Sequence, residues 1–543
     1  MDGTIGLIDI VIIVLYILAV MGIGFYFTRK ETSSDYFLAG RSVTWWAIGA
    51  SLFASNISSE HFIGLAGTGA KSGLAVGHFE WQASFCVLTL GWLFVPFYLR
   101  SGVFTMPEFL EKRYNAACRW YLTAVSIIAY ILTKISVTLI AGSLLLEAVM
   151  GWDYITSSLV LVIATGIYTV AGGLSAVIYT EVLQTVVLIG GAIVLTLVGL
   201  NEVGGWSGLT AKIDPEFFNM FKAMDHPDFP WTGILFGAPI VGVWYWCTDQ
   251  FIVQRVLSAK DEDNAKSGAI FAAYLKLLPV FIMVLPGVIA AALYTSDVGD
   301  TAYPRLVTDL LPTGLKGIVI AGLLAAIMSS LASCFNSSST LITMDVYKKL
   351  RPAASEQNLV MVGRMFTAVM VFLGILWIPF IQVFGAGLYV YLQSVQAYIS
   401  PPITACFLFG VLSSRLTGTG AFSSLIAGFI LGAFRFTLEI LYKSEYALPA
   451  PLVWLATINF LHFAIVLFVI CTIILYAVSY ATLPERREKI RGLTFSTAKE
   501  GIPAAAADEQ LPGLGERTYW HNINLFFSAL VIIIILTLWY IFS

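Results

Sequence analysis

The sequence predicts an all-α membrane protein with about fourteen transmembrane helices. The first observation is composition: 58% of the 543 residues are hydrophobic and only 12% are charged, whereas soluble domains carry about 25% charged residues. The second is length, because many apolar windows reach the roughly 20 residues that span a bilayer. The third is that polar clusters interrupt two spans in corresponding halves, which favours an inverted-repeat transporter.

The spans are expected in an order that leaves short loops between most of them. The first span is longer than a signal peptide and lacks its small-residue cleavage site, so we interpret it as a helix rather than a cleaved leader. The fourteen expected ranges are 5–28, 44–69, 77–99, 117–149, 154–172, 177–201, 232–254, 267–294, 314–347, 357–384, 387–412, 418–441, 451–481 and 522–542.

The distribution of lysine and arginine predicts the orientation in the bilayer. If the N-terminus is outside, most basic residues fall in inner loops, including the run "PERREKIR" that begins at Pro484. Outer loops then hold few of them, and the opposite orientation would break the positive-inside rule. We therefore expect a multi-pass protein of the plasma or inner cell membrane with both termini outside. The outer basic residues are Lys212, Lys222, Arg305, Lys316 and Lys443.

The chain is expected to form a single transmembrane domain. All six cysteines fall in or beside spans, so no disulfide framework is expected. The larger loops are 202–231 outside and 482–520 inside, and the Pro/Ala/Gly-rich composition of the inner one favours a mobile linker over a partner-binding segment. The core repeats are expected at about 44–201 and 232–412, and the peripheral helices at 5–28, 418–441, 451–481 and 522–542.

Two interrupted spans carry the polar clusters. In "SLFASNISSEHFIGLAGTG", Ser51–Gly69, polar residues occur almost in a row between apolar stretches, and "WYWCTDQFIVQR", Trp244–Arg255, lies five spans later. Non-helical backbone at membrane depth is tolerated only where it lines a cavity in the protein. The two clusters are therefore predicted to line a water-filled site near the middle of the bilayer.

Ionisable residues within the spans indicate the chemistry of that site. Glu60, Glu80, Asp249 and Lys276 would each cost about 2.5–3.5 kcal/mol at mid-membrane. The alternative is that they are structural ion pairs between helices. Together with asparagine, histidine, glutamine and aromatic residues they form a mixture of neutral donors, acceptors and balanced charges. That mixture suits a neutral polyhydroxylated solute, whereas a carboxylate substrate would call for an arginine or a bare helix N-terminus.

The run "MSSLASCFNSSST" allows two interpretations. Ser329 and Ser330 could supply hydroxyl ligands to sodium, a hard cation, while the broken helix at Ala54 to Ile57 supplies free carbonyls. Equally, these serines could be small residues for close packing of helices.

Other classes of function fit less well. "GAKS" around Lys71 lacks the glycine and spacing of a phosphate loop, and "SEH" is not a metalloprotease motif. Mixed charges argue against a channel, whose selectivity usually relies on a ring of one sign. We expect no enzyme activity and no nucleic-acid partner.

Several long strings resemble the sodium/glucose cotransporters of the sodium:solute symporter family. They include "AGRSVTWWAIGASLFASNISSEHFIGLAGTGAKSGLAVGHFEWQA", "GGLSAVIYTEVLQTVV", "WYWCTDQFIVQRVLSAK", "YLKLLPVFIMVLPG" and "MSSLASCFNSSSTLITMDVYKKLR". The resemblance runs from the first span to about residue 415 and more loosely to the end. It implies two inverted five-helix repeats, as in the leucine transporter, plus peripheral helices.

The resemblance also implies roles for particular residues. The implied inner gate is Tyr245, which would stack on the sugar ring. Asp249 and Arg255 would be structural or gating charges. The implied sugar-binding set is Asn56, Glu60, His61, Phe79, Glu80, Tyr245, Trp246, Lys276, Gln393 and Gln396, and the implied sodium ligands are the carbonyls of Ala54, Ile57 and Ala326 and the hydroxyls of Ser329 and Ser330.

Departures from the animal glucose carriers bear on selectivity and stoichiometry. Glu60 replaces a small residue, as in the bacterial galactose carrier, and Gly242 and Gln396 replace threonines. Near the second sodium site of two-sodium members, this chain has Glu181 for aspartate and Ala332 for threonine. The missing hydroxyl at Ala332 favours one sodium per sugar.

The expected function is a sodium-coupled symporter that imports a hexose, glucose or galactose, by alternating access. One alternative is a carrier for inositol or another polyol, and one from a different class is a sugar-gated pore or sensor. Sodium is expected as the co-transported ion, the bilayer as the surroundings, and a monomer as sufficient for transport.

Overall fold

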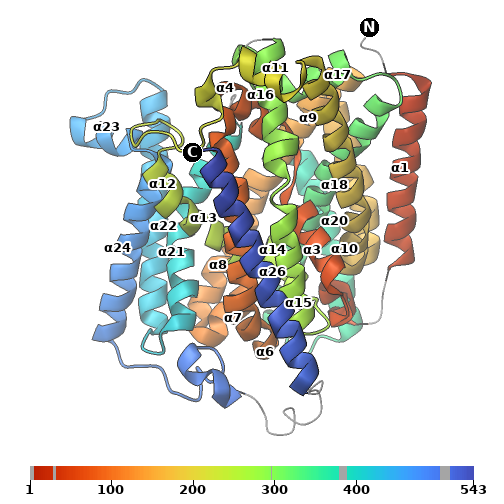
Figure 1. Ribbon diagram of the computed structural model, residues 1–543. Helices are drawn as coiled ribbons and strands as arrows, with labels where there is room; N and C mark the ends of the chain where they lie inside the picture. Colours follow the sequence, from red (N-terminus) through yellow and green to blue (C-terminus); the bar gives the residue numbers. More distant parts are fainter. Residues whose placement is uncertain (1–4, 29–31, 295, 378–387, 502–513) are drawn as a thin grey trace.

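The computed structural model describes residues 5–28, 32–294, 296–377, 388–501 and 514–543. Within them the chain is helical, and the pairing of strands is limited to two isolated bridges, Val43 with Ala259 and Lys222 with Pro230. Long helices pack side by side with their axes close to one direction (Figure 1). α1 begins and α26 ends in the upper half of that view, so both lie toward the same face of the bundle.

The first half of the chain forms α1 to α11. Short π or 3-10 turns join several of these helices into longer segments. The bounds are α1 Leu7–Tyr26, α2 Ser33–Leu38, α3 Trp45–Asn56, α4 Ala66–Ser72, α5 His78–Thr89, α6 Val95–Ser101, α7 Met106–Arg113, α8 Ala116–Ala129, α9 Ser136–Met150, α10 Tyr154–Glu202 and α11 Gly205–Lys212.

The second half continues with helices of more variable length. The bounds are α12 Trp231–Phe236, α13 Ala238–Val243, α14 Gln250–Leu257, α15 Glu262–Leu275, α16 Leu285–Leu293, α17 Ala302–Leu310, α18 Leu315–Leu341, α19 Lys348–Leu350, α20 Glu356–Trp377, α21 Leu388–Leu412, α22 Gly418–Lys443, α23 Ala450–Thr457, α24 Phe460–Ala481 and α26 Leu514–Ile541.

Eleven helical segments of the described chain are long and apolar enough to cross a membrane. The difference from the fourteen expected spans has a physical cause. The spans expected at 44–69 and 232–254 are broken into shorter pieces, and those expected at 154–172 and 177–201 are both within α10. The end of the span expected at 357–384 and the first residue of the span at 387–412 lie outside the described residues.

Two glycines mark places where the chain turns back between neighbouring spans. Gly73 and Gly173 both have positive φ, 70° and 60°, a conformation that side chains other than that of glycine rarely adopt. A Cβ at Gly73 would lie 2.1 Å from the carbonyl oxygen of Phe217, and one at Gly173 would lie 2.5 Å from that of Tyr36. The turn at Gly173 is why the 49 residues of α10 cross the bundle twice.

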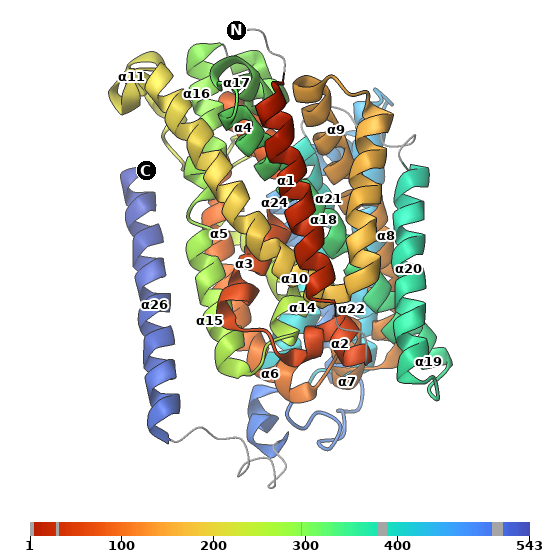
Figure 2. The same ribbon diagram turned by 90° about the vertical axis from the view of Figure 1, so that its right-hand side faces the viewer.

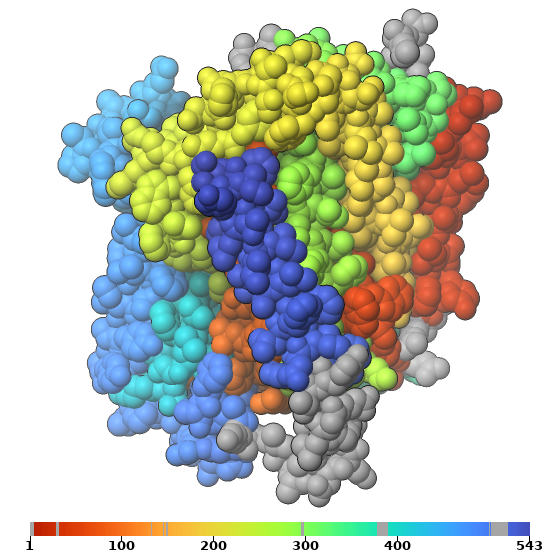
Figure 3. All heavy atoms as spheres, in the orientation of Figure 1, coloured from red at the N-terminus to blue at the C-terminus, as the bar shows by residue number. Residues whose placement is uncertain are grey.

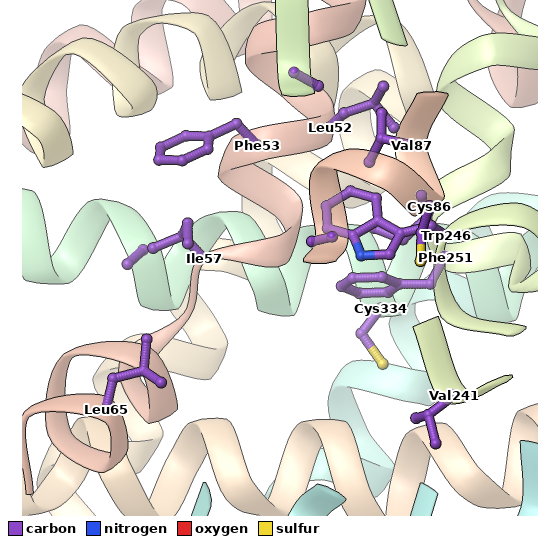
Figure 4. Packing of buried hydrophobic residues seen from close by; sticks show 14 of the residues in the cluster. Leu52, Phe53, Ile57, Leu65, Cys86, Val87, Val241, Trp246, Phe251 and Cys334 are labelled. Atoms are coloured by element: carbon purple, nitrogen blue, oxygen red, sulfur yellow. The ribbon is translucent and has the colours of Figure 1, made fainter. Parts of the chain in front are cut away.

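The first broken span separates at Ile57, which ends α3 in an extended conformation (φ −77°, ψ 115°). Figure 4 shows the ribbon unwound at Ile57, between the helix that carries Phe53 and the turn that carries Leu65. The next residues are held by side-chain hydrogen bonds, since Ser59 Oγ donates to the carbonyl of Thr138 at 3.0 Å and Ser58 Oγ lies 3.2 Å from Thr138 Oγ1. These two hydroxyls tie the unwound residues to α9.

The second broken span separates at Asp249, with nearly the same backbone (φ −78°, ψ 124°). Its carboxylate accepts a hydrogen bond from the backbone N–H of Phe251 at 3.1 Å and so caps α14. The hydroxyl of Tyr130 donates to the same carboxylate. Polar side chains therefore hold the chain at both breaks, and at the second one the side chain also satisfies a freed backbone N–H.

Helix α18 is the buried centre of the bundle, and nearly all of its residues from Lys316 to Leu341 are inaccessible. Helix α10 packs along it, and α20 and α1 lie outside (Figure 2). At the opposite side, α26 crosses the outer face of α15 (Figure 3). The expected span 451–481 begins only at Phe460, because Asn459 caps α24 and separates it from α23.

Part of the inner loop expected at 482–520 is folded against the bundle. Ile490 and Leu493 are buried, and Lys489 Nζ donates to the carbonyl of Tyr114. Glu485 accepts from the backbone N–H of Gly418 at 2.9 Å. Residues 482–501 are therefore anchored to the ends of α8 and α22, while 502–513, in the middle of the expected linker, lie outside the described residues.

Candidate functional site

A cavity of about 70 Å³ lies between the two broken spans. It contains side chains from α3, α5, the π segment after α8, α13, α15 and α21. All ten residues of the expected sugar-binding set line it. The lining residues are Asn56, Glu60, His61, Phe79, Glu80, Gln82, Ala83, Cys86, Lys134, Ala238, Val241, Gly242, Tyr245, Trp246, Lys276, Tyr389, Leu392, Gln393 and Gln396.

Lys276 is the centre of the polar network in this cavity. Its ammonium donates to Asn56 Oδ1 at 2.6 Å and also to the carboxylate of Glu80. The amide nitrogen of Asn56 in turn donates to the hydroxyl of Tyr245 at 3.2 Å. Because these groups come from α3, α5, α13–α14 and α15, the network joins both broken spans.

His61 lies between two carboxylates of the cavity wall, those of Glu60 and Glu80. Its Nε2 is 3.6 Å from Glu80 Oε1, and its Nδ1 is 3.8 Å from Glu60 Oε1. The second oxygen of Glu60 and the side-chain oxygen of Gln82 have no hydrogen-bond partner among the described residues. Buried acceptors of this kind are costly unless a ligand or water satisfies them, so the wall presents free acceptors to the cavity.

Aromatic rings form the apolar part of the cavity. Tyr245 and Trp246 meet edge to face with centroids 5.4 Å apart, and the ammonium of Lys276 lies 5.7 Å from the Trp246 ring centre. Phe79 contacts Tyr389, with centroids 5.9 Å apart. In Figure 4 the rings of Trp246 and Phe251 lie together near Cys86, away from Ile57.

Nine lining residues were not in the expected set, and two of them, Lys134 and Tyr389, contact residues of that set. Lys134 Nζ lies 3.4 Å from Asp249 Oδ2 and 4.2 Å from the centre of the Tyr245 ring. It therefore holds the second break and the Tyr245 ring to the α8–α9 segment. A lysine within the apolar string "YILTKISVTLI" is a signal that could have found it, whereas nothing in the sequence distinguishes Tyr389 from other buried tyrosines.

The expected sodium ligands come together where α18 passes the first break. Ser329 Oγ lies 2.8 Å from the carbonyl oxygen of Ala54 and 2.9 Å from that of Ala326. Ser330 Oγ lies 3.5 Å from the carbonyl oxygen of Ser55. Ile57 is the extended residue that follows α3, three positions after Ala54. This set of neutral oxygens suits a hard monovalent cation, and the described residues hold no cluster of His, Cys, Asp or Glu that would suit a transition metal.

A second buried cluster of charges lies beside Ser333 of α18, further along the helix than Ser329 and Ser330. Arg255 Nη2 is 3.0 Å from Glu181 Oε1, and both side chains are fully inaccessible. The carboxylate of Glu181 also accepts hydrogen bonds from Ser55 at 2.9 Å and Ser333 at 2.6 Å, and another from Ser51. Arg255 thus supplies the positive charge next to this carboxylate.

Solved structures identify the fold. The chain is similar to a sodium-coupled sialic acid symporter, with a TM-score of 0.75 and 21% identity, covering 89% of this chain and 99% of that one. It is also similar to Mhp1, a nucleobase-cation-symport-1 family transporter, with a TM-score of 0.52 and 13% identity, covering 87% and 100%. The fold, with its two broken spans, is that of a leucine-transporter-type secondary transporter, as the sequence predicts.

The chain belongs to the sodium:solute symporter family, whose model matches residues 36–428. It is 43% identical to sodium/glucose cotransporter 4 of Mus musculus, over 90% of this chain and 78% of the relative. It is 41% identical to sodium/glucose cotransporter 1 of Ovis aries, over 93% and 83%, and 42% identical to sodium/glucose cotransporter 2 of Rattus norvegicus, over 90% and 80%. The protein is a multi-pass, sodium-coupled solute symporter and not an enzyme.

Proposed function

We propose that this symporter imports a neutral hexose, glucose or galactose, together with one sodium ion. The observation that carries the proposal is the network around Lys276, where one ammonium bridges Asn56 and Glu80 at the edge of a cavity with aromatic walls. Sugar hydroxyls need both donors and acceptors, and sugar C–H faces pack on rings. The names of the curated relatives support the same class of substrate.

The size of the cavity supports alternating access. A volume of about 70 Å³ is smaller than the roughly 300–1,000 Å³ of typical small-molecule sites. A hexose therefore needs the lining helices to move apart, and the contacts between Asn56, Tyr245 and Lys276 must separate as it enters. In this proposal Tyr245 closes the inner side of the site, and Lys134 and Asp249 hold it there.

Sodium is assigned to the oxygen atoms of Ala54, Ile57, Ala326, Ser329 and Ser330. These atoms belong to the break in α3 and to α18, so a cation between them would join the two elements. A ligand shifts a conformational equilibrium only by its differential affinity for the two states. Sodium therefore binds the outward-facing form more tightly and prepares the neighbouring sugar site, which begins at Asn56.

The Glu181 cluster supports a stoichiometry of one sodium per sugar. The carboxylate is already neutralised by Arg255 and hydrogen-bonded by serines, and Ala332 adds no hydroxyl. One charge crossing about 100 mV contributes about 2.3 kcal/mol, and a tenfold sodium gradient adds about 1.4 kcal/mol. One sodium could thus concentrate the sugar by roughly 500-fold at most.

Uptake by the purified protein in proteoliposomes tests the proposal. We expect sodium-dependent accumulation of labelled glucose or galactose against its gradient, with one positive charge moved per sugar. If the protein prefers inositol to hexoses, the transported solute is a polyol and not a hexose. Sugar-induced current without accumulation would identify a pore or sensor and overturn the symport of sugar.

A further inference from the structure

A second cavity, of about 430 Å³, lies at the end of the bundle that the distribution of basic residues predicts to be cytoplasmic. It is formed where the α6–α7 turn, α8 and the α18–α19 junction meet. Figure 2 shows α6, α7 and α19 at this lower end of the molecule. Its volume falls within the roughly 300–1,000 Å³ of small-molecule sites. Its lining includes Phe104, Glu108, Arg119, Lys348 and Lys349.

Cations predominate in and around this cavity. Lys348 lies with its ammonium 5.3 Å from the centre of the Phe104 ring, and the guanidinium of Arg41 lies 5.8 Å from the same ring. Arg41 donates to the carbonyls of Gly102 and Val103, at 3.0 and 3.2 Å. Neither cation has a carboxylate within 4.0 Å among the described residues.

The neighbouring carboxylates are already engaged with other groups. Glu111 pairs with Arg119 and Lys349. Glu108 accepts from the backbone N–H of Phe104 at 2.9 Å and lies 3.3 Å from Lys112. The carboxylates close to the cavity therefore form no direct ion pair with Arg41 or Lys348 in the described part of the chain, and attract them only at longer range, Glu108 acting on Arg41 and Glu356 on Lys348.

Asp345 and Glu356 are two further carboxylates near this cavity. Asp345 accepts from Arg119 Nε and from Thr105 Oγ1, both at 2.8 Å. Glu356 accepts from the backbone N–H of Ser33 at 2.8 Å. Neither of these acids forms an ion pair with Arg41 or Lys348 in the described part of the chain.

We propose that this cavity binds a phosphate-bearing anion, with Lys348 and Arg41 as its charge partners. Lysine and arginine form strong charge-assisted hydrogen bonds with phosphate oxygens. Two sources share this chemistry: the headgroup of an anionic phospholipid, for which basic pockets at the cytoplasmic side are suitable, and a soluble phosphate ester.

The position of the cavity relates its occupancy to transport. Asp345 belongs to the segment that continues α18, and its bonds to Arg119 and Thr105 join that segment to α8 and the start of α7. Helix α18 also carries Ser329 and Ser330. An anion bound between the α6–α7 turn and Lys348 therefore stabilises one arrangement of these elements, and uptake changes with its occupancy.

Two binding measurements on the full chain distinguish the sources. In the first, inorganic phosphate and a hexose 6-phosphate are titrated into detergent-solubilised protein at constant ionic strength while the melting temperature is followed. In the second, melting temperature and uptake are compared between bilayers of phosphatidylcholine alone and bilayers that also contain phosphatidylglycerol. A saturable rise in melting temperature during the titration in detergent supports a soluble phosphate ester. A rise that occurs only in bilayers containing phosphatidylglycerol supports a lipid headgroup.

Matched variants assign the effect to the cavity. Lys348→Gln should raise the anion concentration that gives half-maximal stabilisation about tenfold. Lys348→Arg should restore the original concentration. Lys260→Gln, which removes an exposed lysine outside the cavity lining, should leave it unchanged. Stabilisation by neither probe, or an equal loss in Lys348→Gln and Lys260→Gln, would overturn the proposed site. Because these readouts include melting temperature, they are independent of which solute the protein transports.

Discussion

Two buried ion pairs near α3 differ in what surrounds them. Lys276 and Glu80 are 1% and 3% exposed and lie at the wall of the smaller cavity, together with Glu60 and Gln82, each of which has one oxygen without a hydrogen-bond partner in the described part of the chain. Arg255 and Glu181 are completely inaccessible, and serine hydroxyls from α3 and α18 surround the carboxylate. The first pair can exchange protein contacts for ligand contacts, whereas the second has its bonds satisfied within the protein.

This comparison assigns binding to the Lys276 pair and stability to the Arg255 pair. A buried ion pair is not by itself evidence for stability, because desolvation offsets much of the attraction. Removing one partner, however, leaves an uncompensated charge, and the cost then depends on whether water can reach it.

The largest effect is expected for Arg255→Met. This change leaves Glu181 buried without its positive partner, which typically costs about 3–5 kcal/mol. Heating followed by fluorescence-detected size-exclusion chromatography should show a strong fall in melting temperature or loss of folded protein. In the double variant Arg255→Met with Glu181→Gln, part of the stability should return. An unchanged melting temperature for Arg255→Met would contradict a stabilising role of the pair.

Lys276→Gln should lower sugar affinity more than it lowers stability. A hydrogen bond to a charged group contributes about 1.5–3 kcal/mol, so half-saturation by hexose should rise by about 10- to 100-fold. Water in the cavity can solvate Glu80, and the melting temperature should fall less than for Arg255→Met. Uptake kinetics and thermal melting measure the two effects.

Lys266→Gln is the matched control for that change. Lys266 lies on α15, the helix that Lys276 caps at its C-terminus, and pairs with Glu262 away from the smaller cavity. We expect its hexose half-saturation to equal that of the unmodified protein. If Lys276→Gln leaves sugar affinity unchanged, or destabilises the protein as much as Arg255→Met, the distinction between the two pairs fails.

Ser329→Ala should raise the sodium concentration needed for half-maximal uptake. Losing one neutral ligand that contributes about 1 kcal/mol to sodium binding corresponds to about a fivefold increase in this sodium concentration. Ser339→Ala removes another buried hydroxyl of α18, one that donates to the carbonyl of Gly363, and should leave the sodium dependence unchanged. Equal sodium dependence in both variants would place the ion elsewhere.

Gln393→Glu is expected to have the smallest effect, a change of a few-fold in hexose half-saturation. The substitution replaces an amide that can donate with a carboxylate that only accepts, in a cavity that already holds Glu60 and Glu80. Gln357→Glu, at the exposed start of α20, introduces the same charge outside the cavity. Identical sugar affinities in the two variants would remove Gln393 from the proposed site.

Most of the helical architecture could be predicted because apolar length and polar interruption are local properties. The breaks near Asn56 and within Trp244–Arg255 follow from runs of polar residues, and the structure places extended residues at Ile57 and Asp249. The separation of α23 from α24 was not predicted, because an asparagine within an apolar stretch gives no sign of whether it will cap a helix.

The partners across the bundle were harder to predict than the breaks. Glu181 and Arg255 are 74 residues apart, and their pairing depends on how α10 and α14 pack rather than on any spacing along the chain. Lys134 was missed although a lysine within an apolar span is conspicuous. Its contacts with Asp249 and Tyr245 arise only when the second break meets the α8–α9 segment.

Binding of labelled hexose to the purified protein, with and without sodium, tests most directly whether the break in α3 and the α18 serines couple the ion to the sugar. Sodium should lower the hexose Kd, hexose should lower the sodium Kd by the same factor, and Ser329→Ala should reduce this factor while Ser339→Ala should not. A hexose Kd that is the same in the presence and absence of sodium would contradict this coupling.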